Sequence, residues 1–155
     1  MTAQMTSSAS QQDSIAVAVK ILREGARLPY RGSEHATGWD LYACLDREVT
    51  LGQIPVIIPT GIAVAVPPGW DAQVRPRSGL ARKGILSTLG TIDPDYRGEL
   101  MVTMYTTSPA IRHSIRHGDR IAQLVISRAA EPEFTLVDDL DATARGDGGH
   151  GSTGR

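Results

Sequence analysis

Short segments of alternating or β-branched apolar residues recur along this chain, and they constrain its fold more than any other feature. SIAVAVKIL alternates over residues 14–22, and VTLGQIPVIIP, GIAVAVPPGW, ELMVTMY, RIAQLVI and EFTLV are similarly rich in β-forming residues. Alternation with a period of two is typical of strands, not helices. Proline, glycine and aspartate separate the segments, as expected of turns. We therefore predict an all-β fold of many short strands, a distorted jelly-roll barrel or sandwich.

One short helix is expected in SGLARKG, at residues 78–84. Ser78 is predicted to cap its start and Gly84 to end it. The length of 155 residues suits one domain with a hydrophobic core. After residue 141 the chain turns small and polar, which is typical of segments that cannot bury apolar surface. We predict a disordered tail at 1–13, a barrel domain at 14–140 and a mobile, glycine-rich arm at 141–155.

Charge and composition argue against several function classes. Sixteen basic and 17 acidic residues give a net charge of −1, whereas a dedicated nucleic-acid binder is usually clearly basic. No apolar run approaches the roughly 20 residues that a membrane span needs, and residues 1–13 lack the features of a signal peptide. Cys44 is the single cysteine, so no intrachain disulfide can form. We expect a cytoplasmic protein without nucleic-acid or membrane partners.

Two stretches carry residues suited to phosphate chemistry, and each also has a purely structural interpretation. PRSGLARKG and the residue before it place Arg75, Arg77 and Ser78 at a helix start, which suits an anion but is more often a solvated basic turn. GTIDPDYRGEL predicts a β-hairpin in which Asp93 and Asp95 form the turn. The functional alternative needs Asp93 to point inward as a general base.

Three further stretches are open between structure and ligand binding. ATGWDLYA places Asp40 on a short strand, either as a strand-end aspartate or near a metal ion. In GDRIAQLV, Arg120 is expected in a buried ion pair, and Gln123 could reach a ligand. His113 and His117 in HSIRHGD have i, i+4 spacing, but alternation there favours a strand or turn, which would separate them by roughly 13 Å and argues against zinc.

The last stretch, RGDGGHGSTG, is a tail with many free backbone N–H groups. Together with Arg145, Ser152 and Thr153, these groups could form a nest for phosphate oxygens if a ligand orders the segment. The structural alternative is an unstructured tail.

Five motifs, taken in order, resemble those of the trimeric deoxyuridine triphosphatase family (dUTP diphosphatase, dUTPase) in its bacterial form. The motifs are ATGWDLYA (36–43), PRSGLA (76–81), GTIDPDYRGEL (90–100), GDRIAQLV (118–125) and RGDGGHGSTG (145–154). The resemblance implies a homotrimer with active sites shared between subunits and Mg²⁺ as cofactor. It implies hydrolysis of dUTP to dUMP and pyrophosphate by water attack on the α-phosphorus, which lowers dUTP and supplies dUMP for thymidylate synthesis.

Residue roles follow from the same resemblance. Asp93 matches the aspartate that deprotonates the attacking water, Tyr96 the tyrosine packed under the deoxyribose, and Asp40 an aspartate that holds a Mg²⁺-bound water. The other substrate-binding positions are Arg77, Ser78, Gly79 and Gln123 at the phosphates, Thr91 and Ile92 at the uracil, and Arg145, His150, Gly151, Ser152 and Thr153 in the arm.

Two positions depart from the family pattern. His150 stands where most members have phenylalanine, and Ser87 where many bacterial members have asparagine. Two alternative functions are a dCTP deaminase, which shares the fold, and a catalytically silent relative that binds dUTP or a protein as a signal. The third and fifth motifs are of the hydrolase type, and the presence of Asp93, Tyr96 and Arg145 together argues against a silent relative.

Overall fold

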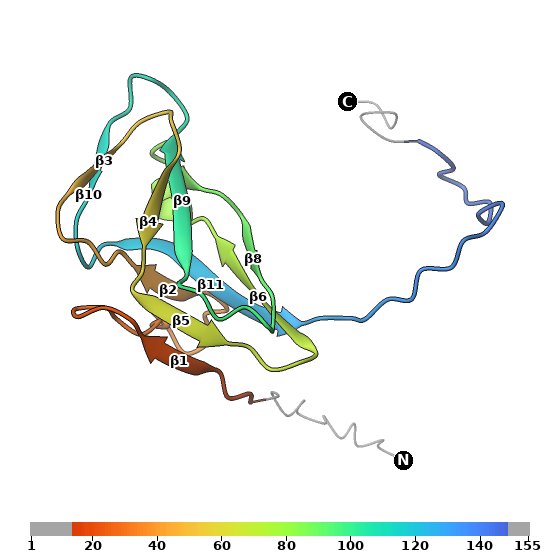
Figure 1. The fold of residues 1–155 in the computed structure, drawn as a ribbon. Coiled ribbons are helices and arrows are strands. Elements are labelled where there is room, and N and C mark those ends of the chain that lie inside the picture. The colour runs from red at the N-terminus through yellow and green to blue at the C-terminus, as the bar shows by residue number, and fades with distance from the viewer. Residues whose placement is uncertain (1–13, 149–155) are drawn as a thin grey trace, which may run out of the picture.

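A computed structural model describes residues 14–148, over which the chain forms eleven strands and one short helix (Figure 1). The strands form four antiparallel sheets. The four-stranded sheet contains, in order, β2 (Trp39–Tyr42), β11 (Arg120–Arg128), β6 (Trp70–Arg75) and β8 (Gly90–Ile92). The three-stranded sheet contains β4 (Val56–Pro59), β9 (Met101–Thr106) and β7 (Ile85–Ser87). The two-stranded sheets pair β1 (Ala18–Ile21) with β5 (Ile62–Ala65), and β10 (His113–Ile115) with β3 (Val49–Leu51).

The core lies between the sheets, and each sheet contributes its inward face. On β9, for example, Val102 and Met104 are buried. Met101 and Thr103, which alternate with them, are less buried and face outward. This period of two is the alternation seen in the sequence. The large side chains with almost no exposure come from all four sheets and the segments beside them: Leu41, Leu51, Ile58, Ile62, Leu100, Val102, Met104, Ile115 and Ile121. The predicted all-β, jelly-roll-like fold is confirmed.

One predicted strand is wrong. EFTLV forms no strand. The last strand, β11, ends at Arg128, and residues 129–148 run away from the barrel (Figure 1). A strand needs a neighbour to satisfy its backbone N–H and C=O groups, and this segment has no partner strand among residues 14–148. Its side chains are accordingly exposed: Phe134 is 92% exposed and Leu136 99% exposed.

The hairpin predicted for residues 90–100 is also wrong. β8 pairs with β6 in the four-stranded sheet, whereas β9 pairs with β4 and β7 in the three-stranded sheet. Both edges of β9 are therefore occupied, and β8 cannot pair with it. The stretch crosses from one sheet to the other, and its exposed part, residues 93–98, is called the 93–98 loop below.

The single helix, α1 (Ser78–Ala81), has a different cap from the predicted one. Arg77 occupies the N-cap position with an extended backbone (φ −88°, ψ 128°), and no side chain caps the helix, so Ser78 is the first helical residue. Gly84 ends the turn that follows, as expected, with a left-handed φ of +73° and its N–H bonded to the carbonyl of Ala81.

Polar side chains on the outward face of β6 form a network with a predicted pH dependence. Asp71 accepts hydrogen bonds of 2.7 Å from Ser127 Oγ and 2.7 Å from Gln73 Nε2, and these bonds, Ser127 first, hold its pKa below the ordinary value. A carboxyl with a lowered folded pKa stabilises the fold above its unfolded pKa of 3.8. That contribution disappears as the pH falls through the lower, folded pKa.

We therefore expect Asp71→Asn to lower the Tm by about 2–4 °C at pH 7. The difference should vanish below the lowered pKa, where the wild-type carboxyl is itself protonated. Thermal unfolding of both proteins from pH 7 down to about pH 2 measures it. A Tm difference that stays constant over this range would contradict the assignment.

In the part of the chain that the structure covers, residues 14–148, we find no helix both long and apolar enough to cross a membrane.

Candidate functional site

Asp40 is the centre of a charged cluster at the end of the four-stranded sheet. Its Oδ1 accepts a 3.0 Å hydrogen bond from Arg77 Nε, and its Oδ2 accepts one of 3.2 Å from Arg120 Nη1. Arg77 also donates from Nη1 to the carbonyl of Arg120, at 3.1 Å. The ion pair predicted for Arg120 is thus present. The carboxylate is buried, whereas about half of the Arg120 side chain is exposed.

Strand register brings these residues together from distant parts of the sequence. Asp40 on β2 stands opposite Gln123 on β11, and Gln123 stands opposite Arg75 at the end of β6, just before Arg77. Gly38 leaves room for this arrangement, since a Cβ there would lie 2.8 Å from Cδ of Gln123. The structure therefore places Asp40, Arg77 and Gln123, from three predicted motifs, at one sheet end.

The electrostatics of this cluster favour an anion. Two guanidinium groups share one carboxylate, which leaves one positive charge without a counter-charge inside the cluster. Each guanidinium has five N–H donors in a fork that matches phosphate oxygens, and the bonds above use only some of them. Ser78 and Gly79 follow Arg77 directly and are exposed, with open space around Gly79. This end of the sheet can bind a phosphate group.

The 93–98 loop holds the other predicted catalytic residues. Asp93 and Tyr96 are both exposed, so Asp93 does not point inward within this chain. The backbone N–H of Tyr96 donates to the carbonyl of Asp93 at 3.0 Å, which closes a turn. Arg97 Nη1 caps this turn by donating to the carbonyls of Pro94 at 2.6 Å and Tyr96 at 2.8 Å. Thr91, exposed, and Ile92, packed against the core, precede the loop on β8.

The predicted residues form three groups that no described hydrogen bond or ion pair joins: the Asp40 cluster, the 93–98 loop and the segment at Arg145. Among the hydrogen bonds and ion pairs described for residues 14–148, none joins Asp93, Tyr96 or Arg145 to the Asp40 cluster. Arg145 bonds only locally there, from Nε to the carbonyl of Gly148 at 2.8 Å. His150, Gly151, Ser152 and Thr153 lie outside the described residues. Within residues 14–148, the structure therefore brings together Asp40, Arg77 and Gln123, which are predicted to act at the phosphates and at Mg²⁺, but it does not join them to Asp93 or Tyr96.

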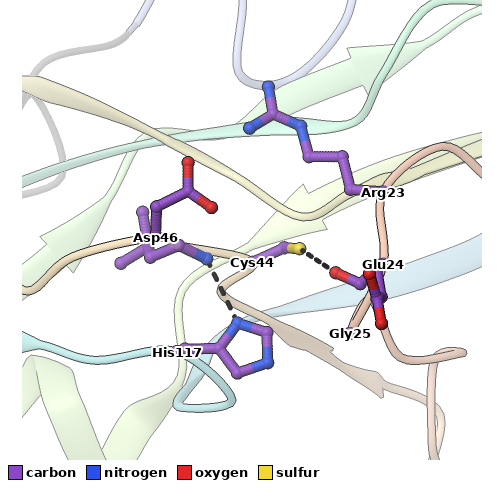
Figure 2. A pocket seen from close by; sticks show the side chains of 7 residues that line it. Arg23, Glu24, Gly25, Cys44, Asp46 and His117 are labelled. Carbon is purple, nitrogen blue, oxygen red and sulfur yellow. Dashed lines mark hydrogen bonds between the residues drawn. The ribbon is translucent and has the colours of Figure 1, made fainter.

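A cavity of about 570 Å³ lies away from these residues, and its lining includes Arg23, Cys44 and His117 (Figure 2). Its reactive groups are held by the backbone. The Cys44 thiol donates to the carbonyl of Glu24 at 3.7 Å, and His117 Nδ1 accepts the N–H of Leu45 at 3.3 Å. Since the thiol and His117 Nδ1 each bond to the backbone, the geometry supports a structural role for both.

A second, larger groove of about 920 Å³ is mostly apolar. It opens between the β1–β5 pair and the four-stranded sheet. Its lining includes Ile15, Val17, Leu28, Trp39, Trp70 and Ile126.

Sequence reasoning missed Glu99 and the partner of Arg120. Arg120 was expected in an ion pair, and its partner is Asp40, which also pairs with Arg77. Glu99 was not singled out, although its backbone carbonyl accepts a hydrogen bond from the Tyr96 hydroxyl at 3.1 Å. Both residues lie inside the motifs, Arg120 in GDRIAQLV and Glu99 in GTIDPDYRGEL, but neither motif indicates which residue each one contacts.

Comparison with known proteins gives consistent similarities. The family model for dUTPase matches residues 24–154. The deoxyuridine 5'-triphosphate nucleotidohydrolase of Desulfotalea psychrophila is 48% identical over 136 residues, covering 84% of this chain and 89% of that protein. A mutant dUTPase from phage phi11 of S. aureus, solved with a coordinated structural Mg(II) ion, has a TM-score of 0.75 at 26% identity, covering 83% of this chain and 100% of the other. The dUTPase of Staphylococcus bacteriophage 80alpha with dUPNHPP has a TM-score of 0.77 at 27% identity, covering 92% and 100%.

Proposed function

This chain belongs to the dUTPase family, and we propose on that premise that it hydrolyses dUTP to dUMP and pyrophosphate. The observation that carries the proposal is the cluster at the sheet end. There, residues of three separate motifs, Asp40, Arg77 and Gln123, converge with a surplus positive charge. By this reaction the protein lowers dUTP and supplies dUMP for thymidylate synthesis.

The phosphate chain binds at the cluster. Arg77 can turn a bidentate fork of donors toward phosphate oxygens, and Gln123 adds an amide donor beside it. Backbone N–H groups at Ser78 and Gly79 are exposed next to Arg77 and complete the phosphate contacts. A nucleotide triphosphate carries several negative charges, so it competes effectively with Asp40 for the two arginines.

Asp93 is the general base. It lies in the exposed 93–98 loop, where water has access, and its carboxylate takes the proton from the attacking water. The water oxygen bonds to the α-phosphorus as the bond to the bridging oxygen of the β-phosphate breaks. Pyrophosphate leaves with the electron pair of that bond, so no covalent enzyme intermediate is needed.

Mg²⁺ fits the residues present when it is held partly by water. Both oxygens of Asp40 already accept a guanidinium N–H, and within residues 14–148 no group of three or more His, Cys, Asp or Glu side chains could hold a metal. Each oxygen keeps a second lone pair, which can accept from a water on the ion. Mg²⁺ commonly keeps waters and takes substrate phosphates as ligands, and it neutralises charge on them.

The β8 strand and the loop after it select the nucleoside. Thr91 and Ile92 offer backbone groups at the free edge of the four-stranded sheet, where a uracil edge can pair with them. Tyr96 stands under the deoxyribose and fills the space that a 2′-hydroxyl would need.

Tyr96→Ala should therefore relax the discrimination between dUTP and UTP. Removing the ring opens room for the 2′-hydroxyl, and the ratio of kcat/KM values for dUTP and UTP is expected to fall by roughly 10- to 100-fold. Steady-state kinetics with both nucleotides measure the ratio. If the ratio matched that of the wild type, Tyr96 would not be the sugar gate.

The segment from residue 141 onward acts as an arm that closes over the bound triphosphate. Arg145 and, further on, Ser152 and Thr153 supply donors to the γ-phosphate, while Gly151 lets the backbone approach and His150 stacks on the uracil. The layout with a tail at 1–13, a barrel at 14–140 and an arm at 141–155 is part of this proposal. Closure excludes water from the site except for the attacking molecule.

A homotrimer completes the site, with the cluster, the 93–98 loop and the arm supplied by different subunits. The separation of these groups within one chain supports this arrangement. So does the exposed apolar segment around Phe134, Leu136 and Leu140, which suits the apolar groove of a second copy. Burying such side chains contributes about 25 cal/mol per Å² of apolar area.

The cytoplasm is the proposed location. The single cysteine, Cys44, is buried as a free thiol, which suits a reducing compartment.

One assay tests the activity and separates it from the alternatives. With Mg²⁺ present, the protein should release pyrophosphate from dUTP and no ammonia from dCTP. Ammonia release from dCTP would indicate a deaminase. Tight dUTP binding without either product would indicate a silent relative.

A further inference from the structure

Local hydrogen bonds from the Tyr96 N–H and from Arg97 Nη1 shape the turn of the 93–98 loop, but they do not join the turn to the rest of the protein. It is exposed at Asp93, Asp95, Tyr96 and Arg97, and it connects strands that belong to different sheets. β8 fixes its first end through pairing with β6. At the second end, the backbone of Leu100 is hydrogen-bonded to Ile62 and Thr60, and the side chain of Glu99 adds a contact one residue closer to the loop.

Tyr96 packs against the backbone of residues 98–99, at the second end of the loop. Its hydroxyl donates to the carbonyl of Glu99 at 3.1 Å. Its ring covers Gly98, where any Cβ would collide with the ring, as the 2.9 Å separation from Cε2 indicates. The position of the Tyr96 ring therefore depends on where the backbone of residues 98–99 lies.

The side chain of Glu99 ties this backbone to the body of the protein. Oε1 accepts the N–H of Gly61 at 2.8 Å, and Oε2 accepts from Arg23 Nη2 at 3.3 Å. The Glu99 side chain is only 13% exposed, so solvent competes weakly for these bonds. The three residues Glu99, Gly61 and Arg23 are called the Glu99 latch.

The turn at Gly61, to which Glu99 is bonded, is packed and hydrogen-bonded on several sides. Gly61 has a left-handed φ of +72°, and a Cβ there would lie 2.7 Å from Cβ of Ala26 and 2.9 Å from Sγ of Cys44. Its carbonyl accepts the N–H of Leu22 at 2.8 Å. Next to it, Thr60 Oγ1 donates to the carbonyl of Leu100 at 2.7 Å. A group bonded to this turn is therefore held to the barrel core.

We propose that Glu99 is a positioning residue for sugar discrimination, acting through the latch to hold Tyr96 where it excludes a 2′-hydroxyl. The inference rests on the proposed role of Tyr96 for its consequence, but the latch itself is a property of the free protein. Glu99 touches neither substrate nor reacting atoms in this role. Its loss should free the loop without removing any group that binds phosphate.

Two variants of Glu99 and two readouts test the proposal. Glu99→Ala removes both bonds, whereas Glu99→Gln keeps an acceptor for the Gly61 N–H. Amide hydrogen exchange of the protein without nucleotide should rise at residues 95–98 by about tenfold or more in Glu99→Ala and little in Glu99→Gln. The dUTP to UTP ratio of kcat/KM should fall by roughly tenfold in Glu99→Ala and stay near wild type in Glu99→Gln. Partial unfolding of a variant lowers its kcat/KM for dUTP and for UTP equally, so it cannot change this ratio.

Glu48→Ala provides a matched control. Glu48 is also ion-paired with an arginine, Arg116, at 2.6 Å, but it lies next to β3, away from the loop. It should change neither readout.

Unchanged exchange at residues 95–98 in Glu99→Ala would overturn the latch. Raised exchange with an unchanged ratio would overturn the positioning role, provided that Tyr96→Ala does change the ratio. If Tyr96→Ala does not, the assignment of Tyr96 fails, and the exchange experiment alone decides whether the latch exists.

Discussion

Replacing Asp93 with asparagine is expected to abolish most hydrolysis while leaving dUTP binding nearly intact. Asparagine keeps the size and much of the hydrogen bonding of the aspartate, but it cannot take a proton from the attacking water. Loss of a general base lowers kcat by about 10²–10⁴-fold. Arg77 and Gln123, the residues proposed to bind phosphate, lie in the Asp40 cluster and are unchanged, so the binding affinity should remain within a few-fold. Pyrophosphate release and calorimetric titration with dUTP measure the two quantities.

Asp95→Asn is the matched control for this experiment. Asp95 is exposed in the same 93–98 loop, two residues further on, and it carries the same charge. The same substitution there should leave kcat within a few-fold of the wild type. If Asp93→Asn turned over as fast as Asp95→Asn, Asp93 would not be the base. If both lost activity equally, a general effect of loop charge would replace the assignment.

Local alternation was enough to predict the class of fold but not the pairing of its strands. SIAVAVKIL contains β1 and ELMVTMY contains most of β9, where alternate residues are buried because the side chains of a strand point to opposite faces. Which strand lies beside which depends on contacts far apart in sequence. For that reason residues 90–100 resembled a hairpin although their two ends join different sheets. EFTLV has strand composition, but it pairs with no strand in the part of the chain that the structure describes.

Part of the candidate site could likewise be predicted from local sequence motifs, and part depends on contacts between residues far apart in the sequence. The five motifs identified Asp40, Arg77 and Gln123, and the structure places these three together by strand register. No motif indicates that Arg120 shares the carboxylate of Asp40, or that Glu99 reaches Gly61, 38 residues earlier in the chain. Such contacts arise from packing. Likewise, if the protein forms the proposed homotrimer, its sequence cannot indicate which subunit supplies the arm, because every subunit has the same sequence.

Mixing two inactive variants should restore activity if the site is built from several chains. One variant is Asp93→Asn, and the other is a chain truncated before Arg145. Arg145 bonds only to Gly148 within the described residues, so the truncated barrel should still fold and assemble. A working site then needs Asp93 from a truncated chain and an arm from an Asp93→Asn chain. With equal amounts and random assembly in a closed ring, each condition holds for about half of the sites, so about a quarter of wild-type activity should return.

The chains must be co-expressed or refolded together, because preformed trimers need not exchange subunits, and mass measurement should confirm mixed assemblies. The control pairs Asp93→Asn with a truncated chain that also carries Asp93→Asn. No site in that mixture has a base, so it should stay inactive although its assembly is the same. Mixed trimers of the original pair that remained as inactive as either parent would indicate that each chain closes its own site. A measured mass of one chain alone would argue against the trimer itself, and the exposed side chains of Phe134 and Leu136 would then need another partner.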